Sequence, residues 1–418
     1  MVAAAHICGV DFGTSNTTVS VPSGDGAKLI ALEGRAVTLP SAVFWDADGL
    51  PPQFGRAAIA AYTGGEDGRL MRGLKSALGS SLIHEKTRVG NKALAFTDIL
   101  GRFFGHLKTK LDETMPGVSH AVLGRPVHFV DGDAAGDRAA QQVLESIARA
   151  NGFADVGFQY EPIAAALHYE SSVTREELVL IVDIGGGTSD FSLVRVSPGN
   201  RTKLNRDNDI LGTHGIRVGG TDFDRLLSLD QVMPALGLGS LINGGKNPMP
   251  LHYYHDLATW HRINALYSGR ALTGLRQIRY GAAEPALLDR LIRVIESRAG
   301  HSVSMAVETA KIELSHALAT PIRLAALIGA DTGATRQMLE EAVEKPVARI
   351  GQAIADVLAQ AGVRPDAIGT VFMTGGSSSL PALQACVARV LPGVTIAKGD
   401  LLGSVGTGLA LDAKRRFA

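Results

Sequence analysis

The chain contains 418 residues, of which 45% are hydrophobic and 20% are charged, so disordered and fibrous proteins are excluded. Its 41 Lys and Arg residues balance its 41 Asp and Glu residues, which excludes the basic surface of a protein that binds nucleic acid or membranes. With Cys8 and Cys386 as the only cysteines, neither a disulfide framework nor a zinc cluster is expected, and the compartment is predicted to be reducing. The first residues show no signal-peptide pattern and no stretch approaches the ~18 apolar residues of a membrane span, so we expect a cytoplasmic protein.

Hydrophobic periodicity and turn residues predict alternating strands and helices, the pattern of an α/β protein. The N-terminal third is predicted to contain strands at 7–10, 18–21 and 121–129 and helices at 55–62, 69–78 and 97–115. Helices at 133–151 and 161–170 precede strands at 178–184 and 191–196, which lead into a polar hairpin at 200–209. Beyond a glycine- and proline-rich loop at 235–250, we expect a helix at 304–318, a long helix at 337–360 kinked at Pro346, a strand at 368–373 and a helix at 380–391.

Two segments of the chain resemble each other. Residues 10–21 and 182–193 each run from an apolar strand through an aspartate, Asp11 or Asp183, into a turn of small residues and a second strand. Their separation is too long for a solenoid repeat of about 20 to 50 residues. The similarity predicts two duplicated α/β halves, each offering one hairpin to a shared cleft.

The small residues of these turns match the needs of a nucleoside triphosphate. Glycine turns expose backbone N–H groups to phosphates, hydroxyl side chains add donors, and carboxylates hold magnesium, often through its waters. A third glycine turn lies at 375–377, and neither a P-loop nor a dinucleotide-binding glycine motif occurs. One such turn alone is more often only a tight hairpin, but three together favour nucleotide binding. One side of the site is predicted to contain Asp11, Gly13, Thr14 and Ser15, and the other Asp183, Gly185, Gly186, Gly187 and Thr188.

The order of these motifs resembles the ATPase part of the DnaK-type heat-shock chaperones, within the actin-like ATPase superfamily. The resemblance rests on both hairpins, on the segments 161–166 (EPIAAA), 219–224 (GGTDFD) and 308–315 (ETAKIELS), and on the third glycine turn. The segments 124–127 (GRPV) and 403–408 (GSVGTG) are similar to the shortened YegD-like branch of this family. The matches follow the family's order over nearly the whole chain.

The resemblance implies roles for individual residues. From the residues alone, Lys75 would be interpreted as a solvated helix lysine. Glu308, Lys311 and Ser315 would likewise be interpreted as one solvated face of a helix. The implied catalytic residues are Lys75 at the γ-phosphate, Glu161 and Asp183 at the attacking water, and Thr188 on the γ-phosphate. The implied magnesium ligands are Asp11, Asp183 and Asp190. The residues implied to bind ATP or ADP are Gly13, Thr14, Ser15, Gly185, Gly186, Gly187, Thr188, Gly219, Gly220, Glu308, Lys311, Ser315, Gly375, Gly376 and Ser377.

The resemblance also implies an actin-like α/β fold, with two lobes and duplicated mixed sheets around a central nucleotide cleft. Lobe I would contain residues 1–172 and 393–418, and lobe II residues 173–392, with 225–303 as a variable subdomain. The implied function is a slow magnesium-dependent ATPase of the chaperone type, whose cleft closure protein partners could sense. Because a DnaK-type chaperone continues into a peptide-binding domain and this sequence ends at Ala418, no such domain is expected.

Two positions depart from the family pattern. The family usually has arginines beside the adenine where this chain has Ile312 and Ser379, so weaker base recognition is expected. A nucleotide sensor with little turnover therefore stays an alternative. A filament-forming actin-like ATPase, which would sediment with ATP, and a small-molecule kinase, which would need a second substrate, are others.

A histidine group, His252, His255 and His261, lacks metal-site spacing and is expected at the surface or in packing.

Overall fold

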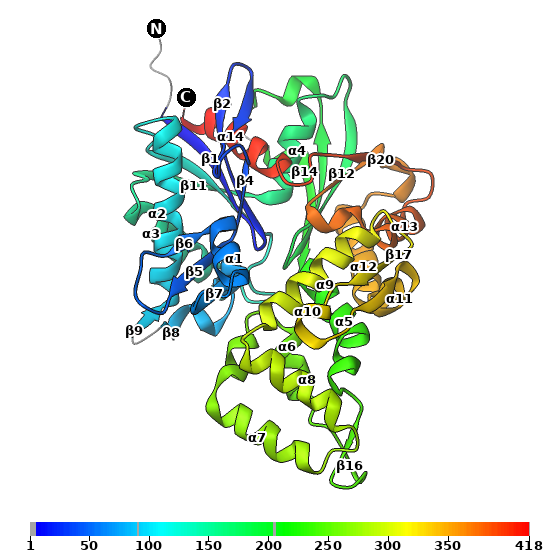
Figure 1. The fold of residues 1–418 in the computed structure, drawn as a ribbon. Helices are drawn as coiled ribbons and strands as arrows, with labels where there is room; N and C mark the ends of the chain where they lie inside the picture. Colours follow the sequence, from blue (N-terminus) through cyan, green and yellow to red (C-terminus); the bar gives the residue numbers. More distant parts are fainter. Residues whose placement is uncertain (1–5, 90–91, 204–205, 418) are drawn as a thin grey trace. The chain divides into compact units, whose positions relative to one another are not determined.

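The computed structural model describes residues 6–89, 92–203 and 206–417 of the chain (Figure 1). The prediction that no signal peptide is present concerns residues 1–5, which lie outside this range. The chain forms two compact units, the first from Met1–Gly219, Arg349–Ser378 and Leu383–Ala418, and the second from Gly220–Ala348 and Ser379–Ala382. The two lobes expected from the resemblance are a different division, and their boundaries stay a prediction. Within the described ranges, no helix is both long and apolar enough to cross a membrane.

The first unit contains two mixed β-sheets with the same topology. In both, the first strand of a hairpin pairs antiparallel with the second strand and parallel with a strand from much later in the chain. The predicted α/β class with duplicated mixed sheets is therefore confirmed. The first sheet has the order β11-β10-β1-β2-β3, with β4 paired to β2, and consists of β1 (Ile7–Phe12), β2 (Asn16–Ser23), β3 (Gly26–Leu29), β4 (Thr38–Pro40), β10 (His120–Arg125) and β11 (Asp155–Tyr160). The second has the order β20-β19-β12-β13-β14 and consists of β12 (Glu177–Ile184), β13 (Ser189–Val196), β14 (Ile210–Ile216), β19 (Thr370–Thr374) and β20 (Thr395–Lys398).

The two hairpins with the predicted phosphate-binding turns occupy equivalent places in these sheets. Pairing of β1 with β2 places Asp11 opposite Thr18, and pairing of β12 with β13 places Asp183 opposite Asp190. Each turn follows the carboxyl end of a strand that also has a parallel neighbour. Ligands bind at such strand ends in open α/β sheets, so the topology itself favours a site here.

Helices α4 (Glu161–Glu170) and α14 (Ser404–Phe417) pack against each other (Figure 1). A Cβ atom on Gly408 would collide with the carbonyl oxygen of Ala164, so the crossing requires a glycine. The close approach lets Ile163 of α4, Leu409 of α14 and Val179 of β12 share one buried cluster. Small residues in the segments 161–166 and 403–408 thus have a packing role as well as carrying the family resemblance.

One face of the first sheet packs against the cluster of α4 and α14, and the other face is covered by α2 (Phe96–Thr114) and α3 (Ala134–Ala150). Phe12 of β1 packs against Phe103 and Phe104 of α2, with ring centroids 5.7 and 5.2 Å apart. Ile7, at the other end of β1, belongs instead to the buried cluster that contains α4 and α14. Successive residues of a strand point to opposite faces, so β1 is buried on both sides, as its apolar sequence requires.

A predicted helix at 69–78 is wrong. The residues form β7 (Gly68–Arg72), which pairs with β5 (Ala42–Asp46), and a 3₁₀ turn at Leu74–Ala77. Gly73, between them, has a φ of 58°, in the left-handed region that a right-handed helix cannot include. The same subregion contains β6 (Gln53–Phe54), α1 (Gly55–Thr63), β8 (Lys86–Val89) and β9 (Lys92–Ala95).

A predicted long helix at 337–360 is divided at Val343. It consists of α11 (Arg336–Ala342) and α12 (Glu344–Ala361), and Pro346 lies in the first turn of α12, where the missing N–H is tolerated. The break therefore precedes the proline rather than coinciding with it. The helix predicted at 380–391 is α13 (Pro381–Val390).

The second unit is mainly helical. Its predicted loop at 235–250 contains the short hairpin β15 (Leu241–Ile242) and β16 (Asn247–Pro248), and all three residues of the histidine group are exposed. A second hairpin consists of β17 (Ala319–Ile322) and β18 (Thr332–Thr335). The helices are α5 (Gly220–Gln231), α6 (His252–Ala258), α7 (Gly269–Tyr280), α8 (Pro285–Glu296), α9 (Gly300–Leu314), α10 (Ala325–Ile328) and α11.

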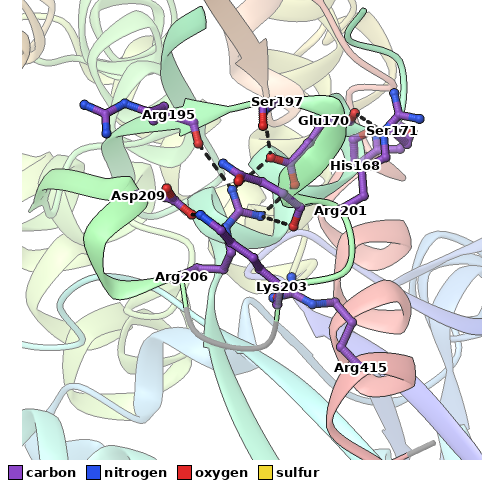
Figure 2. A network of polar contacts seen from close by, with 11 residues as sticks. His168, Glu170, Ser171, Arg195, Ser197, Arg201, Lys203, Arg206, Asp209 and Arg415 are labelled. Atoms are coloured by element: carbon purple, nitrogen blue, oxygen red, sulfur yellow. Dashed lines mark hydrogen bonds and ion pairs between the residues drawn. The ribbon is translucent and has the colours of Figure 1, made fainter. Parts of the chain in front are cut away.

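A buried network of ion pairs fixes the carboxyl end of α4 (Figure 2). Arg206 lies between two carboxylates: its Nη1 donates to Glu170 Oε2 at 2.6 Å and its Nε to Asp209 Oδ2 at 2.8 Å. None of the three side chains is more than 8% exposed. The network joins α4 to the predicted polar hairpin, which connects β13 to β14 through 3₁₀ turns at Pro198–Asn200 and Asp207–Asp209. Residues 204 and 205 of that connection lie outside the described part.

Replacement of Arg206 is expected to destabilise the first unit strongly. Arg206→Met leaves the Glu170 carboxylate buried without its cation and leaves Asp209 only its longer contact with Lys203 Nζ, at 3.5 Å. Breaking a buried pair in this way costs about 3–5 kcal/mol of unfolding free energy. Urea unfolding measures the loss. Arg364→Ala is the matched control, because the Arg364–Asp366 pair is 82% and 65% exposed and such pairs contribute about 0–1 kcal/mol. Equal effects of the two variants would contradict the importance of the network.

Candidate functional site

Four carboxylates and one lysine gather at the ends of the two hairpins, all within the first unit. They come from separate elements: β1, β12, β13, the first residue of α4, and the 3₁₀ turn Leu74–Ala77. Four of the five side chains belong to residues that are at most 7% exposed. All five were predicted as site residues, and the structure brings them together: Asp11, Asp183, Asp190, Glu161 and Lys75.

Lys75 and Glu161 form a buried ion pair, in which Lys75 Nζ donates to Glu161 Oε1. Glu161 begins α4, where the helix dipole favours a carboxylate. Burial alone would lower the pKa of Lys75, but the carboxylates of Glu161, Asp11 and Asp190 outweigh burial and raise it. Lys75 is therefore a fixed positive charge, and its interpretation as a solvated helix lysine is excluded by its burial.

The pKa values of the three aspartates in this cluster are raised. Burial and the nearby Glu161 carboxylate raise the pKa of Asp11 and of Asp190 to about 7, and the pKa of Asp183 rises well above its ordinary value. One lysine cannot neutralise four carboxylates, so an added cation would stabilise their ionised forms. Carboxylate oxygens are the ligands that Mg²⁺ prefers.

In the hairpin of β12 and β13, Thr188 and a backbone N–H hold the carboxylate of Asp190 in place. Asp190 Oδ1 accepts a hydrogen bond from the Val127 backbone N–H at 2.7 Å, and Thr188 also hydrogen-bonds its carboxylate. The amide of Gly185 donates to the Thr188 carbonyl at 2.9 Å, which closes the turn between β12 and β13. Asp190 is therefore fixed before any ligand binds.

The turns of the two hairpins lie side by side. A Cβ atom on Gly187 would lie 3.2 Å from Thr14 Oγ1, and one on Gly186 would collide with the Ser15 hydroxyl. A Cβ atom on Gly219 would lie 2.6 Å from the carbonyl carbon of Gly186. The glycines therefore let three chain segments approach closely, through hydroxyl side chains of the first hairpin and through backbone atoms at Gly219, and such glycine turns can expose N–H groups to a phosphate.

A small pocket of about 30 Å³ adjoins these turns, with room for about one or two water molecules. Its lining includes four predicted site residues and five that the sequence analysis missed. Of the missed residues, Arg217 stands two positions before Gly219, so a basic residue close to a glycine motif was the available signal. The lining residues are Thr14, Lys75, Ser76, Gly79, Pro126, Phe129, Gly187, Thr188 and Arg217.

The third predicted glycine turn contacts the second hairpin. Ser377 Oγ donates to the carbonyl of Gly185 at 3.2 Å, and Gly375 has a φ of 82°, a conformation that favours glycine. Gly376 follows and starts the 3₁₀ turn Gly376–Ser379. Thr374, opposite Asp183 in the sheet, has a buried hydroxyl with no hydrogen-bond partner among the described residues. Such an orphaned oxygen beside a buried carboxylate suits a bound water or ligand oxygen.

The cluster suits a hydrated cation better than a directly bound one. No three His, Cys, Asp or Glu side chains within 6–89, 92–203 and 206–417 are placed to hold a metal ion. Mg²⁺ usually keeps several waters, however, and is then reached through them. The raised pKa values of the aspartates and the orphaned Thr374 hydroxyl are compatible with that arrangement.

The predicted nucleoside residues lie in the second unit. Glu308 and Lys311 belong to α9, and Ser315 follows its last residue. Lys311 is buried, pairs with Asp224 Oδ1 at 2.8 Å and donates to the Gly220 carbonyl at 3.2 Å. Its charge is therefore already engaged within this unit.

The two departures from the family pattern also lie in this unit. Ile312 is 54% exposed on α9. Ser379 Oγ donates to Ser315 Oγ at 3.5 Å, so one departing position contacts a predicted nucleoside residue. A nucleoside role for these side chains stays a prediction.

Comparison with known proteins relates this chain to one protein family. The family model described as Hsp70 protein matches residues 74–234 and 292–396, which is more than half of the chain. The chaperone protein HscA of Serratia proteamaculans (strain 568) is 26% identical over 430 residues, covering 97% of this chain. The match covers 57% of HscA, so this chain spans little more than half the length of that relative.

The stability of the ligand-free chain is expected to fall as the pH rises from about 4 to 7. Asp11 and Asp190 have a pKa of about 7 in the folded chain, against an ordinary aspartate pKa of 3.8, so between these values the folded chain binds more protons than the unfolded chain. Stability then decreases with rising pH, by at least ~2 kcal/mol given about 1.4 kcal/mol per pKa unit. Thermal unfolding across this range measures the effect. Asp190→Asn should flatten the profile, and an equal slope in both proteins would contradict the assignment.

Proposed function

Because the chain belongs to the Hsp70 family, as its motifs predicted, we propose that these 418 residues bind ATP with magnesium and hydrolyse it slowly as a chaperone-type nucleotide switch. The observation that carries the proposal is the buried cluster of four carboxylates and Lys75 beside the glycine turns. A magnesium–polyphosphate complex complements both parts, since the turns offer N–H donors and the cluster offers anionic oxygens.

The phosphates are proposed to lie against the turns 13–15, 185–188, 219–220 and 375–377. The adjoining pocket of about 30 Å³ is smaller than a phosphate chain, so we expect turns or side chains to shift on binding. Asp11, Asp183 and Asp190 would hold hydrated magnesium, which neutralises phosphate charge when bound. Their ionised forms, disfavoured in the empty cluster, would then be stabilised.

Lys75, Glu161 and Thr188 are proposed to act on the terminal phosphate. The buried ammonium of Lys75 stabilises negative charge that develops there, and Thr188, in the same pocket, donates a hydrogen bond to it. Glu161, which accepts from Lys75, and Asp183 would orient the attacking water. Because Glu161 already neutralises part of the Lys75 charge, modest catalysis and slow turnover are expected.

Base recognition is proposed to involve Glu308, Lys311 and Ser315 and to be loose. Lys311 is committed to Asp224, and the two expected arginines are Ile312 and Ser379. The phosphates would then supply most of the affinity. A chaperone role in the cytoplasm, with protein partners that sense nucleotide-dependent lobe closure, completes the proposal.

The decisive experiment is a titration of labelled ATP with magnesium, run beside a hydrolysis time course. Wild-type chain should bind ATP and hydrolyse it slowly. Lys75→Ala should keep its ATP affinity within about threefold and lose at least tenfold in hydrolysis, about 1.4 kcal/mol of barrier, because the cation acts mainly in the transition state. Lys86→Ala, at an exposed position of β8, is the matched control and should change neither quantity.

Each other outcome of this experiment has a definite meaning. Absence of ATP binding by the wild type would refute the proposal. Tight binding without hydrolysis would identify the nucleotide sensor instead. Loss of affinity in Lys75→Ala, with turnover per bound nucleotide kept, would make Lys75 an affinity residue only.

Introducing an arginine at position 312 is expected to tighten ATP binding. A guanidinium on the adenine contributes roughly 0.5–2 kcal/mol, so Ile312→Arg should improve affinity about two- to thirtyfold, and Ile312 is exposed enough to be replaced without unfolding. Calorimetry with ATP and GTP measures both affinity and base preference. Ile312→Gln, a polar but uncharged variant, is the control. A wild-type preference for ATP beyond a hundredfold, with no gain from the arginine, would show that the base pocket is already complete.

A further inference from the structure

We infer that Arg217 binds the terminal phosphate of ATP and thereby makes the site prefer ATP to ADP. The inference rests on the proposed function, because it concerns the same pocket. It adds a residue that lies outside the motifs identified in the sequence. Three features of Arg217 lead to it: its location, its existing contacts and its charge.

Arg217 lies in the connection between β14 and α5, two positions before the first residue of the glycine pair 219–220. It lines the same small pocket as Thr14, Lys75 and Thr188. These are the residues proposed to meet the phosphates. A basic residue that shares their pocket can reach the same anion after a small side-chain movement, and such movements are common on binding.

The side chain of Arg217 is anchored without being neutralised. Its Nη1 donates to the carbonyl of Gly79 at 2.9 Å, and its backbone N–H donates to Asp131 Oδ2 at 3.3 Å. A guanidinium has five N–H donors, and the bond to Gly79 uses one of them. Across the described residues, no carboxylate forms an ion pair with this guanidinium.

Lys75, the other cation of the pocket, differs in this respect. Its ammonium is buried against Glu161, which offsets its charge before an anion arrives. Arg217 is exposed and retains its full charge for a ligand. The pocket therefore combines one rigid, compensated cation with one adjustable, uncompensated cation.

The chemistry of a guanidinium matches a terminal phosphate. Its planar donors bind two phosphate oxygens at once, a stronger contact than a single ammonium makes. ADP lacks the phosphate that would lie beside Lys75 and Thr188. Arg217 should therefore contribute to ATP affinity and little to ADP affinity.

Calorimetry with the full chain, magnesium, ADP and the β,γ-imido analogue of ATP tests this assignment. Arg217→Ala should weaken the ATP analogue at least tenfold and ADP less than twofold, and Arg217→Lys should lie between Arg217→Ala and the wild type. Arg138→Ala, at an exposed position of α3, is the matched control and should leave both affinities unchanged. Thermal unfolding of each variant checks that the fold is retained.

A double-mutant comparison separates direct contact from positioning. Arg217 holds Gly79, which lies close in sequence to Lys75, so its loss could act through Lys75. If Arg217 contacts the phosphate, Arg217→Ala should still weaken the ATP analogue in a Lys75→Ala background. Disappearance of the effect in that background would overturn the inference.

The remaining outcomes are equally distinct. Equal losses for ATP analogue and ADP, or no loss for either, would overturn the inference while wild-type binding upheld the proposed function. A wild-type chain that binds neither nucleotide would overturn both.

Discussion

Four carboxylates gathered beside a single lysine, three of them buried, are the constraint on which the rest of this structure depends. The carboxylates are not drawn together by attraction: the register of the second sheet places Asp183 opposite Asp190, and the first sheet delivers Asp11 from a separate hairpin. The folding energy of two sheets therefore maintains a repulsive cluster. A cation that binds only the folded cluster would relieve this repulsion, which couples the ligand to the stability of the chain.

Helix α4 transmits this constraint through the first unit. Its first residue, Glu161, accepts from Lys75 in the site, and its last, Glu170, accepts from Arg206 in the network of Figure 2. Between them, Ala164 is pressed against Gly408 of α14. A helix held at both ends and at its middle cannot rotate without breaking a buried ion pair. The position of Glu161 thus depends on residues remote from the site.

The sequence predicted what local pattern determines. Both hairpins, their aspartates and α4 could be predicted because apolar strands, small turns and a helix-starting Glu-Pro pair are readable over a few residues. The helix predicted at 69–78 failed because pairing with β5 decides that segment. Arg217 was missed because its partner, Gly79, is 138 residues away, and no periodicity reports such a contact. Lys75 was identified only through the family resemblance, since composition alone gives a lysine no reason to be buried.

In the second unit, a residue that matches the family motif has a structural role that does not require a bound nucleoside. Lys311 is buried, and a buried ammonium needs a partner whether or not a nucleoside binds; Asp224, from another matched segment, provides it. The pairing of these two residues is therefore sufficiently explained by the fold. Ile312, next along α9, is more than half exposed and has no comparable structural duty. The residue at 312 can accordingly be replaced at little cost to folding, whereas replacement of Lys311 would leave the Asp224 carboxylate without its cation.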